Sequence, residues 1–195
     1  ISTMNLSRLI ALLSLSFLLG GCASPLVFGG AVAGGVTVAN DQRTVGSMVD
    51  DEGIELKAAA ALSDDPDISK QAHINVTSFN GIVLLTGEAP NAALRARATA
   101  IVGKIDRVRR VQNEVTLGEP SSMGSRADDT WVTTKVKSKL LAAKDVAGTR
   151  IKVVTEKGTV FLMGIVTRAS AAGAVREVTN TSGVARVIKM FEYID

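Results

Sequence analysis

The sequence predicts an α+β protein made of two tandem units that share one order of elements. A segment with strand, turn and strand character occurs twice, from Ile74 to Gly87 and from Ile151 to Gly164, and helical periodicity of apolar residues flanks each copy. A stretch rich in glycine, proline and serine, from Gly118 to Ser125, separates the copies and is typical of a linker. Each unit is therefore expected to run helix, strand, strand, helix, strand.

The N-terminal segment is typical of a bacterial export signal. One cation, Arg8, precedes an apolar run from Leu9 to Leu19 that only two serines interrupt. Such a run is too short to cross roughly 30 Å of hydrocarbon as a helix, but it suits the core of a signal peptide. The run ends in Leu19-Gly20-Gly21-Cys22, which resembles the lipobox of bacterial lipoproteins. We therefore expect residues 1–21 to be a lipoprotein signal peptide.

Cys22 is expected to carry a lipid anchor. It is the only cysteine of the chain, and a lone thiol in an exported protein cannot form an internal disulfide. Ala23 and Ser24 follow it, in place of the aspartate that retains Gram-negative lipoproteins at the inner membrane. This predicts an outer-membrane location facing the periplasm, with acyl chains as the membrane contact. The alternative roles for Cys22 are a small buried hydrophobe or the end of an uncleaved anchor.

The segment after Cys22 is rich in glycine and alanine, reading LVFGGAVAGGVTVA from Leu26 to Ala39. It is too short to span a membrane, and its glycines destabilise a helix. Residues 22–43 are therefore expected to form a flexible tether, with a second membrane-contacting stretch as the alternative. We expect the first domain at 44–118, the linker at 119–127 and the second domain at 128–195.

The two hairpins align without a gap. INVTSFNGIVLLTG and IKVVTEKGTVFLMG share the first isoleucine, the turn glycine and the last glycine. β-Branched residues alternate on both sides of Asn80-Gly81 and of Lys157-Gly158, which predicts a tight turn at each of these pairs. Each copy is therefore expected to form a two-stranded hairpin.

Helices are expected on both sides of each hairpin, because apolar residues recur there at spacings of three and four. In the first unit these residues are Ile54, Ala58, Ala61 and Leu62 before the hairpin and Leu94, Ala98, Ile101, Val102 and Ile105 after it. In the second unit they are Val132, Val136 and Leu140, then Ala171, Ala174, Val175 and Val178. A strand-like run closes each unit, around Val108 to Leu117 and Val184 to Ile194.

Taken together, these features resemble the BON domain. The resemblance rests on the hydrophobic-x-V-x-L-x-G hairpin, the helix after it and the final strand at Gly183-Val184-Ala185-Arg186-Val187. It covers about Val49 to Leu117 and Asp128 to Asp195, and it is most specific from Asp128 to Val136. The first unit departs from the pattern at Ile105-Asp106-Arg107-Val108, which lacks the glycine that the second unit has at Gly183.

The resemblance has implications for fold and function. It implies that the helices of each unit pack on a small three-stranded mixed sheet. Together with the N-terminal motif, it implies a dual-BON outer-membrane lipoprotein that supports envelope integrity. It also implies non-enzymatic binding of anionic phospholipid, mainly by the second domain.

The leading helix of the second unit carries a candidate binding surface. At about 100° per residue, Val132, Val136 and Leu140 form its core face, and Trp131 falls roughly 140° from the centre of that face. An indole favours a membrane interface, and each lysine near an anionic surface contributes roughly 1 kcal/mol. The alternative is that Trp131 packs against the first domain or the linker. The residues predicted to bind a phospholipid such as phosphatidylglycerol are Trp131, Lys135, Ser138, Leu141, Lys137 and Lys139.

Charge distinguishes the two units. From Arg43 to Gly118, nine Lys and Arg stand against ten Asp and Glu, a net of −1. From Arg126 to Asp195, twelve stand against seven, a net of +5. The second unit is therefore favoured for an anionic ligand, and a periplasmic location argues against nucleic acid as that ligand.

The sequence contains no catalytic constellation. His73 is the single histidine, and no second histidine or further cysteine accompanies it for a metal site or a thiol dyad. The acidic pairs Asp50-Asp51 and Asp64-Asp65 are expected at helix starts and in loops, where capping and solvation suffice. We therefore expect no enzyme, no metal and no cofactor.

Two functions remain. The first is binding of anionic phospholipid through the leading helix of the second domain, next to a membrane to which acylated Cys22 holds the chain. The second is a periplasmic adaptor for outer-membrane assembly or cell-wall remodelling proteins, with Trp131 anchoring the interface.

Overall fold

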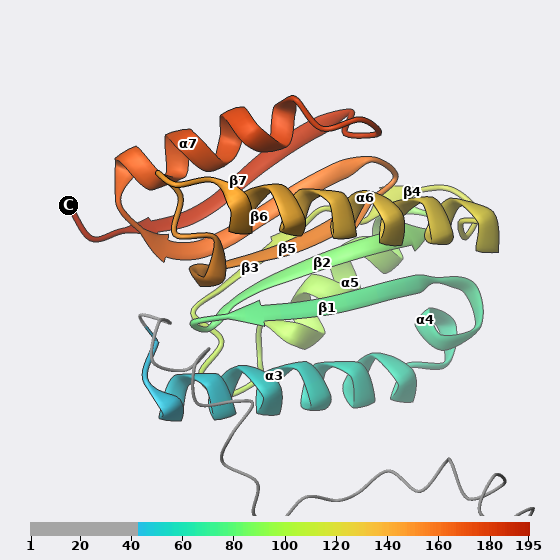
Figure 1. Cartoon of the computed structure of the whole chain (residues 1–195). Helices are drawn as coiled ribbons and strands as arrows, with labels where there is room; N and C mark the ends of the chain where they lie inside the picture. The colour runs from blue at the N-terminus through green and yellow to red at the C-terminus, as the bar shows by residue number, and fades with distance from the viewer. Residues whose placement is uncertain (1–42) are drawn as a thin grey trace, which may run out of the picture. The chain divides into compact units, whose positions relative to one another are not determined.

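The computed structural model describes residues 43–195, which lie within one compact unit of the chain (Figure 1). The predicted signal peptide, Cys22 and the predicted tether up to residue 42 lie outside the described residues. Within the described residues, both halves follow the predicted order of helix, strand, strand, helix, strand.

The first half forms a mixed sheet with three helices on its outer face. Strand β1 pairs antiparallel with β2, and the two short strands β3 and β4 both pair parallel with β2. Because β3 and β4 lie along the same neighbour, they act as one closing strand that is interrupted at Glu114 and Val115. The elements are α3 (Val45–Asp64), α4 (Pro66–Gln71), β1 (His73–Phe79), β2 (Ile82–Ala89), α5 (Ala92–Val102), β3 (Arg110–Asn113) and β4 (Thr116–Leu117).

The second half repeats this plan with a three-stranded mixed sheet. β5 pairs antiparallel with β6, and β7 pairs parallel with β6. Helix α6 begins at Met123, within the segment expected to be a linker, because the Ser122 side chain caps it by accepting a hydrogen bond from the Ser125 N–H. The elements are α6 (Met123–Ala142), the short η1 (Gly148–Arg150), β5 (Ile151–Glu156), β6 (Thr159–Val166), α7 (Arg168–Thr179) and β7 (Arg186–Tyr193).

Each sheet is covered on both faces, which creates four layers: helices, sheet, sheet, helices (Figure 1). The helices of each half pack on the outer face of its own sheet, and the predicted helix residues Ile54, Leu62, Val132 and Leu140 lie in these cores. The inner faces of the two sheets share a third core. That core contains Phe79, Ile82 and Leu84 from the first half and Phe161, Met163 and Met190 from the second. All eight residues of β2 are buried as a result.

A buried carboxylate ties the leading helix to the hairpin turn in each half. Asp51 of α3 accepts hydrogen bonds from the N–H groups of Asn80 and Gly81 at 2.7 and 2.9 Å. Asp129 of α6 accepts from the N–H groups of Lys157 and Gly158 at 2.8 and 2.9 Å. Both residues of each turn have positive φ, which confirms the predicted tight turns.

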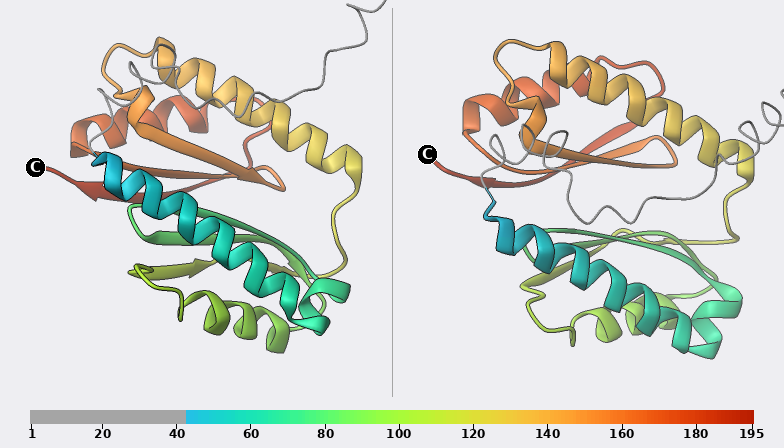
Figure 2. Two further views of the ribbon diagram at one scale, coloured as in Figure 1. Left: turned by 90° about the horizontal axis from the view of Figure 1, so that it is seen from below. Right: turned by 60° about the horizontal axis from the view of Figure 1, so that its bottom comes forward.

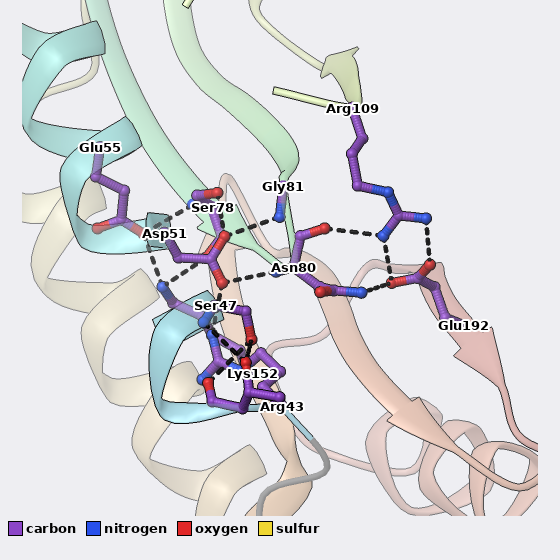
Figure 3. Close-up of polar contacts among 11 residues, drawn as sticks. Arg43, Ser47, Asp51, Glu55, Ser78, Asn80, Gly81, Arg109, Lys152 and Glu192 are labelled. Carbon is purple, nitrogen blue, oxygen red and sulfur yellow. Dashed lines mark hydrogen bonds and ion pairs between the residues drawn. The ribbon is translucent and has the colours of Figure 1, made fainter. Parts of the chain in front are cut away.

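Asp51 is therefore not the solvated helix-start residue that the sequence indicated, since only 3% of it is exposed (Figure 3). Burial alone would raise the pKa of its carboxyl group. Hydrogen bonds from Gly81, the Ser78 hydroxyl, Asn80 and Arg43 outweigh that effect and hold the pKa below its usual value. Asp65 meets the expectation more closely, because its side chain caps α4.

Ion pairs surround the core that the two sheets share. Lys152 of β5 lies 2.8 Å from Glu55 of α3, and Glu192 of β7 lies 2.9 Å from Arg109 (Figure 3). Lys157 lies 2.8 Å from Glu88, which is fully buried. Burial would raise the pKa of Glu88, but hydrogen bonds from Lys157 and Ser121 hold it below its usual value. The second half therefore stabilises a buried anion of the first.

The turn carboxylate of the second half gives a first testable prediction. Asp129→Ala leaves the partly buried N–H groups of Lys157 and Gly158 without their acceptor, at a total cost of about 1–3 kcal/mol. The free energy of unfolding, measured by urea titration, should fall accordingly. Asp128→Ala changes an exposed neighbour on the same helix and should stay within about 0.5 kcal/mol of the wild type. Equal stability of the two variants would contradict this role for Asp129.

The buried anion gives a second prediction. Because the folded-state pKa of Glu88 is lowered, its contribution to stability is present at neutral pH and lost as the pH falls through that pKa. Glu88→Gln should therefore lose less stability than the wild type on acidification from about pH 7 to about pH 3. The matched control is Glu119→Gln, an exposed site whose acid dependence should follow the wild type. The pKa of Glu156 is shifted in the opposite direction, because burial and the charges of Glu88 and Asp129 raise it.

Candidate functional site

The outward face of α6 brings together large apolar side chains and lysines. Trp131 and Leu141 are both 63% exposed, and Met123 at the start of the helix is 81% exposed. Val132, Val136 and Leu140 are buried against the sheet, which confirms the predicted core face and the outward direction of Trp131. With 63% of its surface exposed, Trp131 is not buried by the first domain or the linker, the partners that the alternative interpretation gave it.

The predicted lysines fall into two groups. Lys135 and Lys139 are half-buried, and their ammonium groups donate hydrogen bonds to the backbone carbonyls of Ser182 and Asn180. These two lysines therefore hold α6 against the end of α7. Lys137, by contrast, is exposed, as is Ser138. Helical spacing already places Lys135 and Lys139 on one side of α6 and Lys137 on the other. It does not show that carbonyls at the end of α7 accept hydrogen bonds from the first two, because these carbonyls become neighbours only in the folded chain.

A groove lies beside Trp131, with a volume of about 410 Å³. Lys135, Lys157 and Gly183 are among the residues that line it. Gly183 has a φ of +94°, and an added Cβ would lie 2.7 Å from the side chain of Val132. A side chain at position 183 would require the Val132 side chain to shift, and the positive φ also favours glycine there.

The corresponding place in the first half is a groove of about 370 Å³, lined by residues that include Asp50, Gly81, Arg107 and Arg109. Arg107 adopts a φ of +68° there, and its guanidinium pairs with Asp50. Aligning the two turn carboxylates, Asp51 and Asp129, places Gly53 where the second half has Trp131. The same alignment places three alanines, at 59–61, where the second half has Lys137, Ser138 and Lys139. The first half therefore lacks the indole and two of the three lysines of α6, while Lys57 aligns with Lys135.

Sequence reasoning missed two members of this surface. Met123 was excluded because its segment has the composition of a linker, and its helical state depends on the Ser122 cap. Lys157 was assigned only to the hairpin turn, although its side chain also lines the groove. The serine at Ser122 could have indicated an earlier helix start, whereas nothing local to Lys157 indicates that it reaches the groove.

Another cavity, of about 350 Å³, is polar. Its lining includes His73, Asn75, Arg126 and Glu156. Among residues 43–195, no three His, Cys, Asp or Glu side chains are placed to hold a metal ion. In the same residues, no helix has the length and apolar character that crossing a membrane requires.

Comparison with known proteins gives the family. The model of the BON domain matches residues 50–119 and 128–195. The chain is 40% identical to the outer membrane lipoprotein DolP of Haemophilus influenzae over 97% of both chains. It is also 40% identical to the 21 kDa hemolysin of Actinobacillus pleuropneumoniae, over 79% of both chains.

A more distant relative shares part of the chain. The osmotically-inducible protein Y of Escherichia coli is 31% identical over 68% of this chain and 66% of its own.

The similarity over nearly the full length of an outer membrane lipoprotein confirms the predicted outer-membrane location. This chain is an outer-membrane-associated member of the BON-domain family, with two copies of the domain.

Proposed function

We propose that the chain binds anionic phospholipid through α6 of its second BON domain, and that acylated Cys22 holds it at the outer membrane facing the periplasm. The observation that carries the proposal is the exposure of Trp131 and Leu141 on the outward side of α6, where each is 63% exposed. An exposed indole suits a membrane interface, because its ring is apolar and its N–H stays hydrated.

The electrostatics favour an anionic surface over a neutral one. The second half carries a net charge of +5, against −1 for the first. Lys137 is exposed close to Leu141, and Lys144 is exposed just beyond the C-terminal end of α6. Each lysine near an anionic leaflet contributes roughly 1 kcal/mol, within a distance set by the screening length. Lys135 and Lys139 add charge at longer range, although their ammonium groups are engaged in the fold.

The apolar contribution is modest by itself. Full transfer of a side chain such as leucine out of water contributes roughly 1.5–3 kcal/mol, so two or three inserted side chains give weak binding. An acylated Cys22 would supply the remaining affinity, because a tethered domain meets the membrane at a high effective concentration. In this arrangement the anchor sets where the protein is, and α6 sets how the second domain contacts the leaflet.

The proposal predicts the behaviour of the soluble fragment 44–195 in vesicle co-sedimentation. It should bind vesicles containing phosphatidylglycerol, bind zwitterionic vesicles less, and bind less at high salt through screening. Trp131→Glu and Leu141→Glu should each weaken binding at least about tenfold, because each replaces an inserted apolar group with a repelled charge.

The matched control is Leu56→Glu, the same change at a 74% exposed position on α3. It should leave vesicle binding unchanged. Unchanged binding in the Trp131 and Leu141 variants would reject the lipid role of α6. It would leave the adaptor hypothesis, in which Trp131 contacts an outer-membrane assembly or cell-wall remodelling protein.

The anchor is tested separately in the full chain. Cys22→Ser should abolish incorporation of labelled palmitate and release the protein from the membrane fraction into the periplasmic extract. Ser24→Ala, a neighbouring change that keeps the thiol, should preserve both. Palmitate labelling of the Cys22→Ser variant would show that the anchor lies elsewhere.

A further inference from the structure

Helix α3 has an outward face that is apolar although nothing in the described chain covers it. Val45 and Val49 are 63% and 62% exposed, and Leu56 is 74% exposed. Seen from below, α3 lies at the front of the molecule, on the outside of the first half (Figure 2). Its opposite face is already buried in the core of the first half through Ile54 and Leu62. A helix with apolar residues on both sides normally has a second packing partner.

The exposed residues follow the spacing of a helix–helix contact. Steps of four, three, four, three and four residues connect six positions along α3, all of them exposed. This is the repeat by which one helix presents a continuous seam to another. The six positions are Val45, Val49, Glu52, Leu56, Ala59 and Ser63, which we call the α3 seam.

Gly53, beside the seam, indicates close approach of an outside group. A glycine inside a helix costs about 1 kcal/mol relative to alanine. The fold does not require this glycine, because an added Cβ would meet no atom within 4 Å and its φ is not positive. Gly46, one heptad earlier, is similar, since its nearest neighbour would be the Thr44 hydroxyl at 3.7 Å. Both positions give a neighbouring helix access to the backbone of α3.

Charge selects the kind of partner. α3 contains five acidic residues, at positions 50–52, 55 and 64, and a single basic residue, Lys57. Three of the carboxylates, at positions 50, 51 and 55, already pair with basic side chains of this chain, which leaves two for a partner. Of the acidic residues, Glu52 lies in the seam itself and Asp64 lies exposed at its end. An anionic membrane would repel this helix, and α3 of a second copy would bring Glu52 near its own equivalent. A basic helix would gain from the same charges.

We propose that the α3 seam docks a helix of another protein, one with apolar residues at heptad spacing and a lysine or arginine opposite Glu52. The seam belongs to the first BON domain, and its residues differ from those of the lipid-binding surface on α6. The inference therefore does not rest on the proposed phospholipid binding. It gives the chain two outward helices with opposite charge and different ligands.

The experiment uses the full-length chain in its own cells, with a photo-crosslinking amino acid at Val49 or at Leu56. The matched control position is Ala100, which is exposed on α5. Irradiation should give a discrete adduct from Val49 and Leu56 and none from Ala100. Mass spectrometry of the adduct should locate the contact in a lysine- or arginine-containing helical segment of a different protein.

Two substitutions then test the surface itself. Gly53→Gln should raise the melting temperature, since glutamine favours a helix and has open space there, yet it should abolish the adduct at Val49 by blocking close approach. Ala96→Gln, an exposed change on α5, should preserve the adduct. Glu52→Lys should weaken the adduct and leave vesicle binding intact, whereas Trp131→Glu should do the reverse.

Each contrary result would overturn the proposal. No discrete adduct would show that the seam is unoccupied. An adduct with a second copy of this chain would assign the seam to self-association, and an adduct with lipid would assign it to the membrane. An adduct that survives Gly53→Gln in a folded protein would show that helix docking is not what holds the partner.

Discussion

The carboxylate that joins each leading helix to its hairpin turn sets the geometry on which the rest of the structure depends. Asp51 and Asp129 each bind two adjacent N–H groups of a turn whose residues have positive φ. Such a bond fixes both the position of the helix along the sheet and its rotation about its own axis. Because Trp131 follows Asp129 by two residues, about 200° around the helix, a buried Asp129 places the indole outward. The exposed face of α6 is thus a consequence of an inward carboxylate.

The second constraint is the shared core between the two sheets. A small sheet with helices on one face leaves its other face apolar and exposed unless a further layer covers it. Here each half covers the other, with Phe161 and Met163 opposite Ile82 and Leu84. The ion pairs at the rim, such as Lys157 with buried Glu88, make the contact specific, because separating the halves would leave that anion without its partner. The long helices α3, α5, α6 and α7 therefore lie on the outside of the two sheets, and the side of each helix away from its sheet faces solvent.

The two halves share one fold, but their outward surfaces have diverged. Both halves keep the turn carboxylate, the hairpin and the core positions, which the fold requires. The outward faces of α3 and α6 have no such requirement, and they differ in charge and in side-chain size. Trp131 stands where the first half has Gly53, and Gly183 stands where the first half has Arg107. A duplicated domain can in this way present two different surfaces without any change to its core.

The repeat, the order of the main elements, the turns and the inward faces of the helices could all be predicted from the sequence. Each of these depends on local periodicity or on backbone preferences at Asn80-Gly81 and Lys157-Gly158, which neighbouring residues suffice to specify. The sequence also separated the net charges of the halves. Each of these features depends on residues that are close together in the sequence, so it can be predicted without knowing the fold.

Tertiary structure alone decided which side chains are free to act. Lys135 and Lys139 differ from Lys137 because carbonyls at the end of α7, more than forty positions away, accept hydrogen bonds from the first two. Asp51 changes from a plausible helix cap into a buried acceptor because the turn at Asn80 folds against it. The docking of the two sheets likewise depends on residues that are distant in sequence. Contacts of this kind leave no local pattern, and only the folded chain brings their partners together.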